Sequence, residues 1–114
     1  MFKVVYLDDE PELCEIFTSL FSSDEVEIRA FTDPLLAIAH ITKSKPNLFF
    51  TDYYLPKTNG EQIAEALGKD IPIVLVSGAL DLDCKFRFDA FLKKPFRKED
   101  VQALINGFRT KSAS

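Results

Sequence analysis

An alternation of two patterns along the chain constrains the fold more than any other feature. Five short apolar runs are separated by segments in which apolar residues recur at helical spacing. Continuously apolar runs of this length are typical of strands buried on both faces, and their alternation with amphipathic helices indicates parallel strands joined by crossovers. The sequence therefore predicts an α/β fold, a doubly wound five-stranded parallel sheet with helices on both faces.

The predicted strands are brief, and they cover Lys3–Leu7, Val26–Phe31, Leu48–Thr51, Ile71–Val76 and Ala90–Lys93. The predicted helices place apolar residues three and four positions apart. These inward-facing residues are Leu13, Ile16, Phe17 and Leu20 in the first helix, Ile63, Ala66 and Leu67 in the third, and Val101, Leu104, Ile105 and Phe108 in the last. Asp33 and Pro34 are the predicted N-cap and first residue of the second helix, and Asn59 or Gly60 caps the third.

One segment departs from this alternation. Between the fourth and fifth strands, apolar and polar residues alternate at period two, with apolar residues at Leu80, Leu82, Cys84, Phe86 and Phe88. This is the period of a strand at a place where the topology predicts a helix. The pattern alone leaves the conformation of residues 79–89 open.

Length and composition favour a single small domain. The chain has 114 residues, 46% of them hydrophobic, which is enough to fold without disulfides or a structural metal. We expect one domain over residues 1–109, a polar C-terminal tail over 110–114 and no separate effector domain. Cys14 and Cys84 lack metal-ligand spacing and His40 is the only histidine, so the residue inventory argues against zinc sites and against Cys–His or Ser–His–Asp catalysis. Both cysteines are expected to be free thiols in a reducing cytoplasm.

Charge is unevenly distributed. The formal net charge is −4, which gives no electrostatic basis for general nucleic-acid binding. Residues 1–27 hold eight acids and one base, whereas residues 93–114 hold six bases and two acids. The first end is suited to a cation and the second to an anion, although two solvated faces of opposite sign explain the counts equally simply. The N-terminal apolar run Val4–Leu7 is short, so we expect no signal peptide and no membrane span.

Polar residues follow four of the predicted strands. They are Asp8, Asp9 and Glu10 after the first strand, Asp52 after the third, Ser77 after the fourth and Lys94 after the fifth. Each alone has a simpler explanation, such as acids at a helix start, turn residues or a solvated lysine. Ligands of open α/β sheets bind at the carboxyl ends of the strands, where all of these residues are predicted to meet. Together they favour a functional site.

The motifs that carry these residues resemble those of the receiver domain of two-component response regulators. They are Leu7–Glu10, Thr51–Pro56 with Gly60, Val76–Gly78 and Phe91–Pro95, and the resemblance covers essentially the whole chain. It implies the strand order 2-1-3-4-5. It also implies that Asp52 accepts a phosphoryl group from a histidine kinase or a histidine phosphotransfer protein, and that an unknown downstream protein receives the signal. Such a protein is not an enzyme beyond its own aspartyl phosphorylation and dephosphorylation.

Three crowded carboxylates require a cation, because their repulsion otherwise raises their pKa values. Mg²⁺ prefers oxygen ligands and retains several waters, so it suits this set. The resemblance implies that Asp9 and Asp52 bind Mg²⁺ directly, together with the backbone carbonyl of Tyr54, and that Asp8 acts through a water.

The resemblance also assigns the remaining roles. Asp52 is the nucleophile, Lys94 supplies a positive charge, and the Ser77 hydroxyl donates to a phosphoryl oxygen. Phe91 matches an aromatic switch coupled to Ser77, and a core phenylalanine is its alternative. The Lys94–Pro95 bond resembles the family's cis peptide, although sequence does not reveal the isomer.

Two departures from the family bear on function. Ser77 and Lys94 are 17 positions apart, which is shorter than usual for the family by more than one helical turn, so we expect a fourth helix that is shortened or irregular. That loss puts the family's usual partner-binding surface in doubt. Tyr54 is bulky where a hydrolysing water approaches, and we expect it to alter the phosphoryl lifetime.

Two other functions remain as alternatives. A pseudo-receiver would keep the fold and signal without phosphorylation, but the complete set of site residues argues against it. A small aspartate-based phosphatase is suggested only by Asp81-Leu82-Asp83, which does not follow a buried strand, and no second acid lies two residues after Asp52.

Overall fold

A computed structural model describes residues 1–79 and 83–113 of the chain. Five strands form one parallel sheet in the order β2-β1-β3-β6-β7. Their bounds are β1 (Phe2–Leu7), β2 (Val26–Phe31), β3 (Leu48–Asp52), β6 (Ile73–Ser77) and β7 (Ala90–Lys93). A small antiparallel hairpin, β4 (Tyr54–Leu55) and β5 (Thr58–Asn59), follows β3. Because β4 and β5 belong to the separate hairpin, β6 and β7 are the fourth and fifth strands of the sheet in chain order. The observed order is therefore the predicted 2-1-3-4-5, and the predicted fold class is confirmed.

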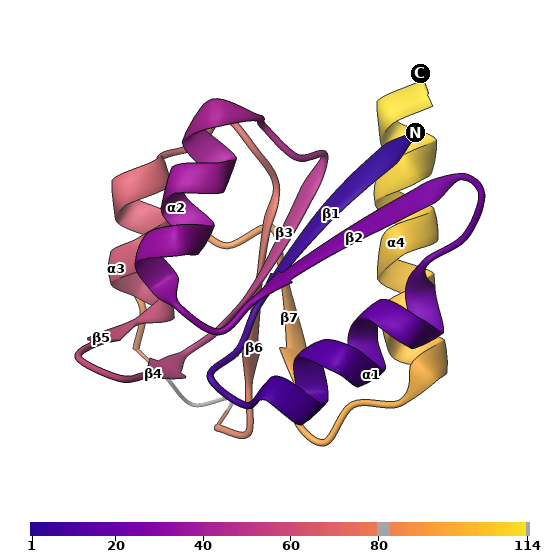
Figure 1. The fold of residues 1–114 in the computed structure, drawn as a ribbon. Coiled ribbons are helices and arrows are strands. Elements are labelled where there is room, and N and C mark those ends of the chain that lie inside the picture. Colours follow the sequence, from indigo (N-terminus) through magenta and orange to yellow (C-terminus); the bar gives the residue numbers. More distant parts are fainter. Residues whose placement is uncertain (80–82, 114) are drawn as a thin grey trace.

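Helices cover both faces of the sheet. In Figure 1, α1 (Pro11–Phe21) and α4 (Lys98–Ala113) lie on one face, and α2 (Pro34–Lys43) and α3 (Gly60–Leu67) lie on the other. The α4 helix continues to Ala113 and so includes most of the polar stretch 110–114. No helix in the described part of the chain is long and apolar enough to span a lipid bilayer.

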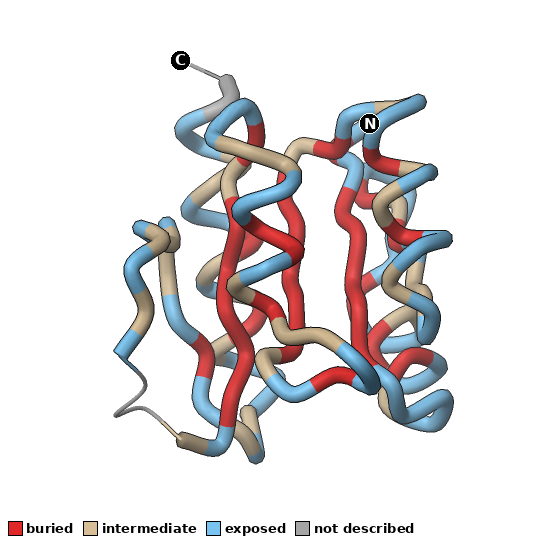
Figure 2. The backbone as a smooth tube through the Cα atoms, turned by 90° about the vertical axis from the view of Figure 1, so that its left-hand side faces the viewer, coloured by how far each residue is buried: buried red, intermediate tan, exposed pale blue. Residues whose placement is uncertain are grey.

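The core consists of two apolar layers separated by the sheet, with the buried strands between the helices in Figure 2. Strand side chains alternate between the two faces. On β1, Val4 and Tyr6 pack on the α1 and α4 side, while Val5 and Leu7 pack on the α2 and α3 side. All five residues of β3 are buried, as expected for the central strand of a covered parallel sheet.

The starts of two helices follow the predicted capping chemistry. Asp33 Oδ1 accepts the Leu35 N–H at 2.9 Å with Pro34 as the first helical residue, and Asn59 Oδ1 accepts the Gln62 N–H at 2.9 Å. Each carboxylate or amide oxygen satisfies a backbone donor that has no partner within its helix.

The buried faces of α1 and α3 differ in part from the prediction. Cys14, Phe17 and Phe21 are the buried residues of α1, whereas Ile16 and Leu20 are 50% and 43% exposed. In α3, Ala64 is buried in place of Ala66, which is exposed. In both helices, the face that packs on the sheet is shifted around the helix axis from the predicted apolar face, so some of the predicted inward residues face solvent.

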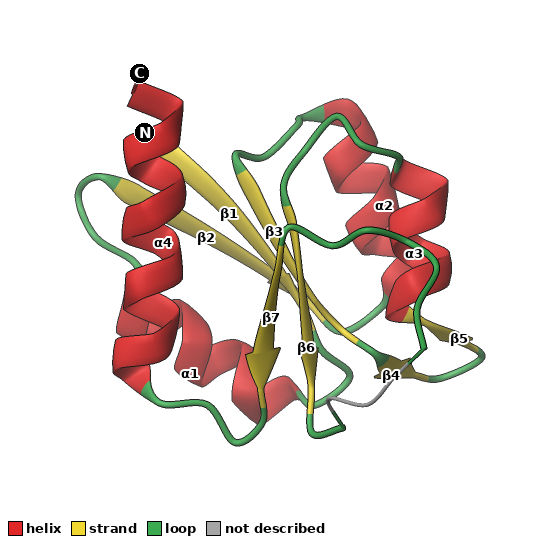
Figure 3. Ribbon diagram, turned by 180° about the vertical axis from the view of Figure 1, so that it is seen from behind, coloured by secondary structure: helices red, strands yellow, loops and turns green. Residues whose placement is uncertain are grey.

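The connection between β6 and β7 contains no helix among its described residues, 78–79 and 83–89 (Figure 3). Residues 83–89 alternate between exposed and half-buried, as the period-two pattern indicates. Leu80 and Leu82 lie outside the described residues. Glu61 Oε2 accepts the Phe86 N–H at 2.8 Å, and Asp89 Oδ2 accepts the Ile73 N–H at 2.7 Å. These bonds hold the segment against α3 and the sheet in place of helical packing.

Candidate functional site

Three acidic side chains meet at the carboxyl edge of the sheet. β1 and β3 are hydrogen-bonded neighbours with Leu7 opposite Thr51, so Asp8 and Asp52 follow at the same level. One carboxylate oxygen from each of Asp8, Asp9 and Asp52 lies within 4.8 Å of the others. Asp8 is fully buried and Asp52 is 7% exposed, while Asp9 faces solvent. The predicted cluster of acids is therefore present.

Lys94 reaches this cluster from the edge strand. Its Nζ donates to Asp8 Oδ2 at 2.8 Å and to Asp52 Oδ2 at 3.1 Å. Its backbone N–H donates to the Ser77 carbonyl at 2.9 Å, and the Lys94–Pro95 peptide bond that follows is cis. One ammonium group thus lies between two buried carboxylates that are 44 positions apart in the chain.

The Asp8 carboxylate accepts three hydrogen bonds from the protein. Oδ1 accepts the Glu10 N–H at 3.0 Å, and Oδ2 accepts the Tyr6 hydroxyl at 2.9 Å as well as Lys94. The Asp8 backbone carbonyl also accepts the Cys14 thiol at 3.4 Å. In contrast, no donor among the described residues bonds to the Asp9 carboxylate. Asp8 is held in place by the protein, and Asp9 is open to an external cation.

Tyr6 is the residue of the site that sequence reasoning missed. A tyrosine within a buried apolar strand needs a partner for its hydroxyl. Because strand residues two positions apart point to the same face, Asp8 was the nearest acceptor in sequence. This combination is the signal that could have identified Tyr6.

Burial and charge shift the ionisation of the site in known directions. Burial raises the pKa of the Asp52 carboxyl, Asp8 and Asp9 add to the rise, and Lys94 only partly offsets it. For Lys94, burial lowers the pKa, but the bonds to Asp8 and Asp52 outweigh it and the pKa is raised. Burial and the neighbouring Asp8 raise the pKa of Tyr6, so its hydroxyl remains a hydrogen-bond donor at neutral pH. The site therefore holds a firmly protonated lysine among acids that favour further positive charge.

The cluster fits a magnesium ion. All of its side-chain ligands are carboxylate oxygens, which Mg²⁺ prefers, and one lysine leaves three acids incompletely neutralised. Its combination of a solvent-facing acid and a buried one suits an ion that retains part of its water shell.

Three further predicted residues, Ser77, Phe91 and Tyr54, differ in burial and in their position along the strands. Ser77 is buried directly after Val76, the residue opposite Asp52 in the sheet, and its Oγ accepts the Ala79 N–H at 3.0 Å. Phe91 is 59% exposed on β7, so it does not fill the core. Tyr54 is 61% exposed and its ring lies edge-on to Tyr53. Ser77 and Tyr54 follow the carboxyl ends of β6 and β3, with Ser77 buried and Tyr54 exposed, whereas Phe91 lies within β7 opposite Leu75.

Gly60 allows α3 to begin beside the acidic cluster. A Cβ at this position would lie 2.6 Å from the Asp52 backbone oxygen and 3.0 Å from a Leu75 methyl group. The Gly60 N–H donates to the Tyr53 carbonyl at 2.8 Å. Only glycine permits this approach, which fixes the chain just after Asp52.

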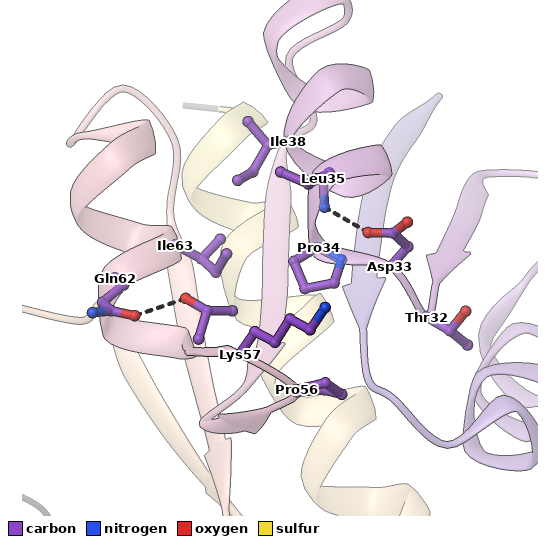
Figure 4. Close-up of a pocket in the computed structure, with 10 residues that line it drawn as sticks. Thr32, Asp33, Pro34, Leu35, Ile38, Pro56, Lys57, Gln62 and Ile63 are labelled. Atoms are coloured by element: carbon purple, nitrogen blue, oxygen red, sulfur yellow. Dashed lines mark hydrogen bonds between the residues drawn. The ribbon is translucent and has the colours of Figure 1, made fainter.

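Two cavities in the described part of the chain differ in whether an acid of the cluster lines them. A cavity of about 660 Å³ lies between α2 and the β4–β5 hairpin, and Figure 4 shows it lined by residues such as Pro34, Ile38, Lys57 and Ile63, but by none of the acidic cluster. A groove of about 540 Å³ runs along α1 and is lined by Asp9, Glu10, Pro11, Glu12, Leu13 and Ile16. Asp9 is thus the acid of the cluster that lines the α1 groove.

Comparisons with known proteins agree with this geometry. The family model for the response regulator receiver domain matches residues 4–106. The chain is 24% identical over 110 residues to the DNA-binding response regulator MtrA of Mycolicibacterium smegmatis and 28% identical over 110 residues to the regulatory protein VanRc of Enterococcus gallinarum. Each alignment covers 90% of this chain and 48% of the relative, so the chain spans about half the length of these curated relatives.

Solved structures show the same fold. The chemotaxis protein CheY4 of Vibrio cholerae superposes with a TM-score of 0.86 at 19% identity, over 95% of this chain and 98% of that one. A CheY-like receiver domain from Methylobacillus flagellatus gives a TM-score of 0.85 at 21% identity, with the same two coverages. With a family model that spans nearly its whole length, the chain belongs to the response regulator receiver domain family.

Proposed function

We propose that this receiver domain accepts a phosphoryl group on Asp52 from a phosphohistidine donor, with Mg²⁺ bound, and signals through protein contacts. The observation that carries the proposal is the Lys94 ammonium held between Asp8 and Asp52 within a cluster of three carboxylates. Transfer of a phosphoryl group depends on positioning and charge rather than on a general base, and this site supplies both.

The transfer itself needs only groups that are present in the chain and the donor. An Asp52 carboxylate oxygen forms a bond to phosphorus, and the bond between phosphorus and the donor's imidazole nitrogen breaks. The electron pair of that bond stays on the nitrogen, and because the second ring nitrogen of the donor histidine carries a proton, the leaving group is neutral imidazole. Lys94 turns its positive charge toward a phosphoryl oxygen, and the Ser77 hydroxyl donates to another. Asp52 needs no base because its ionised form is the nucleophile.

The metal would be held by the residues named from the resemblance. Asp9 and Asp52 bind it directly together with the backbone carbonyl of Tyr54, and Asp8 acts through a water. When bound, the ion supplies positive charge that balances the phosphoryl oxygens. Asp9 accepts no hydrogen bond from the described residues, whereas Asp8 already accepts three, and this contrast supports the division between direct and indirect ligands.

The α1 groove is the proposed approach for the donor, a histidine kinase or a histidine phosphotransfer protein. It begins at Asp9 and continues past Leu13 and Ile16, and Leu20 is also exposed on the same helix. An apolar strip that ends at the acidic cluster suits a helix that carries a phosphohistidine.

The output is proposed to be a protein contact in the cytoplasm. The net charge of −4 offers nucleic acid no general attraction. Phosphorylation would draw the Ser77 hydroxyl toward the phosphoryl group and let the exposed Phe91 ring follow inward, which shifts an existing equilibrium. The downstream protein would read the position of that ring.

The test is phosphate uptake from a small donor. Incubation with acetyl phosphate and Mg²⁺ should add one acid-stable, base-labile phosphate, detected by intact mass. Asp52→Asn should gain none, whereas Asp70→Asn, which removes an exposed carboxylate paired with Lys45, should behave as the wild type. No uptake by the wild type would instead support a pseudo-receiver, and turnover of a phosphate ester would support a phosphatase.

A further inference from the structure

We propose that the Tyr6 hydroxyl is a positioning group for the phosphoryl transfer: it fixes the orientation of the Asp8 carboxylate and weakens the hold of that carboxylate on the Lys94 ammonium. The inference rests on the proposed function and adds a residue to it. Tyr6 lies inside the core and has no route to the donor, to Asp52 or to solvent, so any effect on the chemistry passes through Asp8.

One oxygen atom connects the two groups. Asp8 Oδ2 accepts the Tyr6 hydroxyl at 2.9 Å and the Lys94 ammonium at 2.8 Å, and the same ammonium reaches Asp52 at 3.1 Å. A chain of three hydrogen bonds thus runs from a core side chain to the proposed nucleophile. The other Asp8 oxygen is bonded to the Glu10 N–H, so both ends of the carboxylate are fixed.

The Tyr6 ring is itself held by an aromatic cluster beneath the site. It stacks on Phe17 with ring centroids 4.0 Å apart and an interplanar angle of 13°. Phe17 also packs edge-on against Phe50 at 5.2 Å and Phe96 at 6.3 Å. Each of the three rings that contact Phe17 lies two positions along the chain from a site residue: Tyr6 from Asp8, Phe50 from Asp52, and Phe96 from Lys94. Phe17 therefore supports all three chain segments that carry the site, and Tyr6 is the member of this cluster with a polar group.

A fixed Asp8 carboxylate matters because Lys94 has to change its partner during the transfer. On transfer, the ammonium turns toward a phosphoryl oxygen while Asp8 stays in place. The hydroxyl supplies a second donor to Asp8 Oδ2, which lessens the hold of that oxygen on Lys94 and prevents the carboxylate from rotating with it. Without the hydroxyl, Asp8 binds Lys94 more tightly and its orientation is less fixed. We expect the cost in the rate of transfer, because the Tyr6 hydroxyl is bonded to Asp8 and not to the direct metal ligands Asp9 and Asp52.

Tyr6→Phe tests the inference because it keeps the ring and removes one oxygen atom. Phosphorylation by acetyl phosphate is followed at a series of Mg²⁺ concentrations, which separates the maximal rate constant from the half-saturating Mg²⁺ concentration. We expect the maximal rate constant to fall about tenfold, the scale of one hydrogen bond to a charged group, with less than about a twofold change in half-saturation. Asp9→Asn should instead raise the half-saturating Mg²⁺ concentration.

Thr18→Ala is the matched control, since the Thr18 hydroxyl donates to the Cys14 carbonyl within α1 and no bond joins it to the acids. It should keep the wild-type rate constant even where it lowers the midpoint of urea unfolding. A Tyr6→Phe rate constant within twofold of wild type would overturn the inference, and so would a rate loss matched by Thr18→Ala or accompanied by a parallel rise in half-saturating Mg²⁺. Failure of the wild type to take up phosphate would instead contradict the proposed function.

A second test uses the wild-type protein alone and measures how fast the Tyr6 hydroxyl proton exchanges with water, so it does not depend on the folding of a variant. The Tyr6 hydroxyl proton is buried and bonded to a carboxylate, so it should give a slowly exchanging proton resonance with cross-relaxation to the Asp8 and Lys94 side chains. Rapid exchange of that proton with water would show that the hydroxyl does not hold Asp8.

Discussion

Three aspartates of the same chemical type acquire different properties from their surroundings. Asp8 is buried and accepts three hydrogen bonds, Asp52 is buried with one ion-pair partner, and Asp9 faces solvent. Burial raises the pKa of Asp52 and so makes its ionised form dependent on Lys94 and an added cation. The proposed division into anchor, nucleophile and metal ligand follows from these environments.

Tyr54 offers a prediction at this scale. Its ring is 61% exposed two residues after Asp52, where it can obstruct the approach of water to an aspartyl phosphate. We expect Tyr54→Ala to speed dephosphorylation by roughly threefold to tenfold, because excluding water protects a reactive intermediate. The measurement is the first-order loss of phosphate after removal of the donor. Tyr53→Ala serves as the control, and equal lifetimes for wild type and Tyr54→Ala would contradict the prediction.

At the scale of elements, the sheet brings the site together and the helix starts set its spacing. The carboxyl ends of β1, β3, β6 and β7 carry the acids, the hydroxyl and the lysine. α3 begins against the end of β3 because Gly60 lacks a side chain. The irregular segment 83–89, held by Glu61 and by its own Asp89, takes the place of a helix between β6 and β7.

A pair of glycine substitutions tests the packing of α3. Gly60→Ala places a Cβ 2.6 Å from a backbone oxygen, and overpacking of this kind costs about 1–3 kcal/mol. Gly107→Ala in α4 meets no atom within 4 Å, and we expect it to stabilise the protein by about 0.5–1 kcal/mol through helix propensity. Urea unfolding of both variants gives the two free energies. A neutral Gly60→Ala would show that α3 does not approach Asp52 this closely.

The elements could be predicted from sequence where local pattern and burial agree. The five strands, two helix caps and the apolar face of α4 were predicted because period, capping residues and burial all point the same way. The predicted buried faces of α1 and α3 were partly wrong, because hydrophobic spacing allows two adjacent apolar stripes on a helix and packing alone decides which one is buried. The conformation of residues 83–89 needed the structure, since its hydrogen bonds come from distant Glu61.

The residues of the candidate site could be predicted from the sequence, but most of the hydrogen bonds between them could not. Strand-end positions identify Asp8, Asp9, Asp52, Ser77 and Lys94 because parallel strands share one functional edge. Which oxygen each donor reaches, and that Tyr6 belongs to the set, depends on side-chain directions inside the core. The outward position of Phe91 likewise depends on packing that a sequence pattern does not describe.

For the whole molecule, the fold brings acids of the N-terminal part of the chain and Asp52 together with Lys94 of the basic C-terminal part. A cation bound there stabilises the folded chain, because the unfolded chain no longer brings the three carboxylates together. At Mg²⁺ concentrations about a hundredfold above the dissociation constant we expect a gain of about 2.7 kcal/mol in the free energy of unfolding.

This linkage is measured by urea unfolding with and without Mg²⁺. Asp9→Asn should lose most of the gain, whereas Asp70→Asn should retain it because that carboxylate lies outside the cluster. Equal Mg²⁺ stabilisation of Asp9→Asn and wild type would place the bound ion elsewhere.

The most direct test of the central claim is the identity of the phosphorylated residue. After reaction with acetyl phosphate and Mg²⁺, borohydride reduction converts an aspartyl phosphate to homoserine, which peptide mass spectrometry locates in the sequence. The account predicts homoserine at position 52 alone, and its loss in Asp52→Asn. Homoserine at position 8 or 9, or none anywhere after demonstrated phosphate uptake, would contradict it.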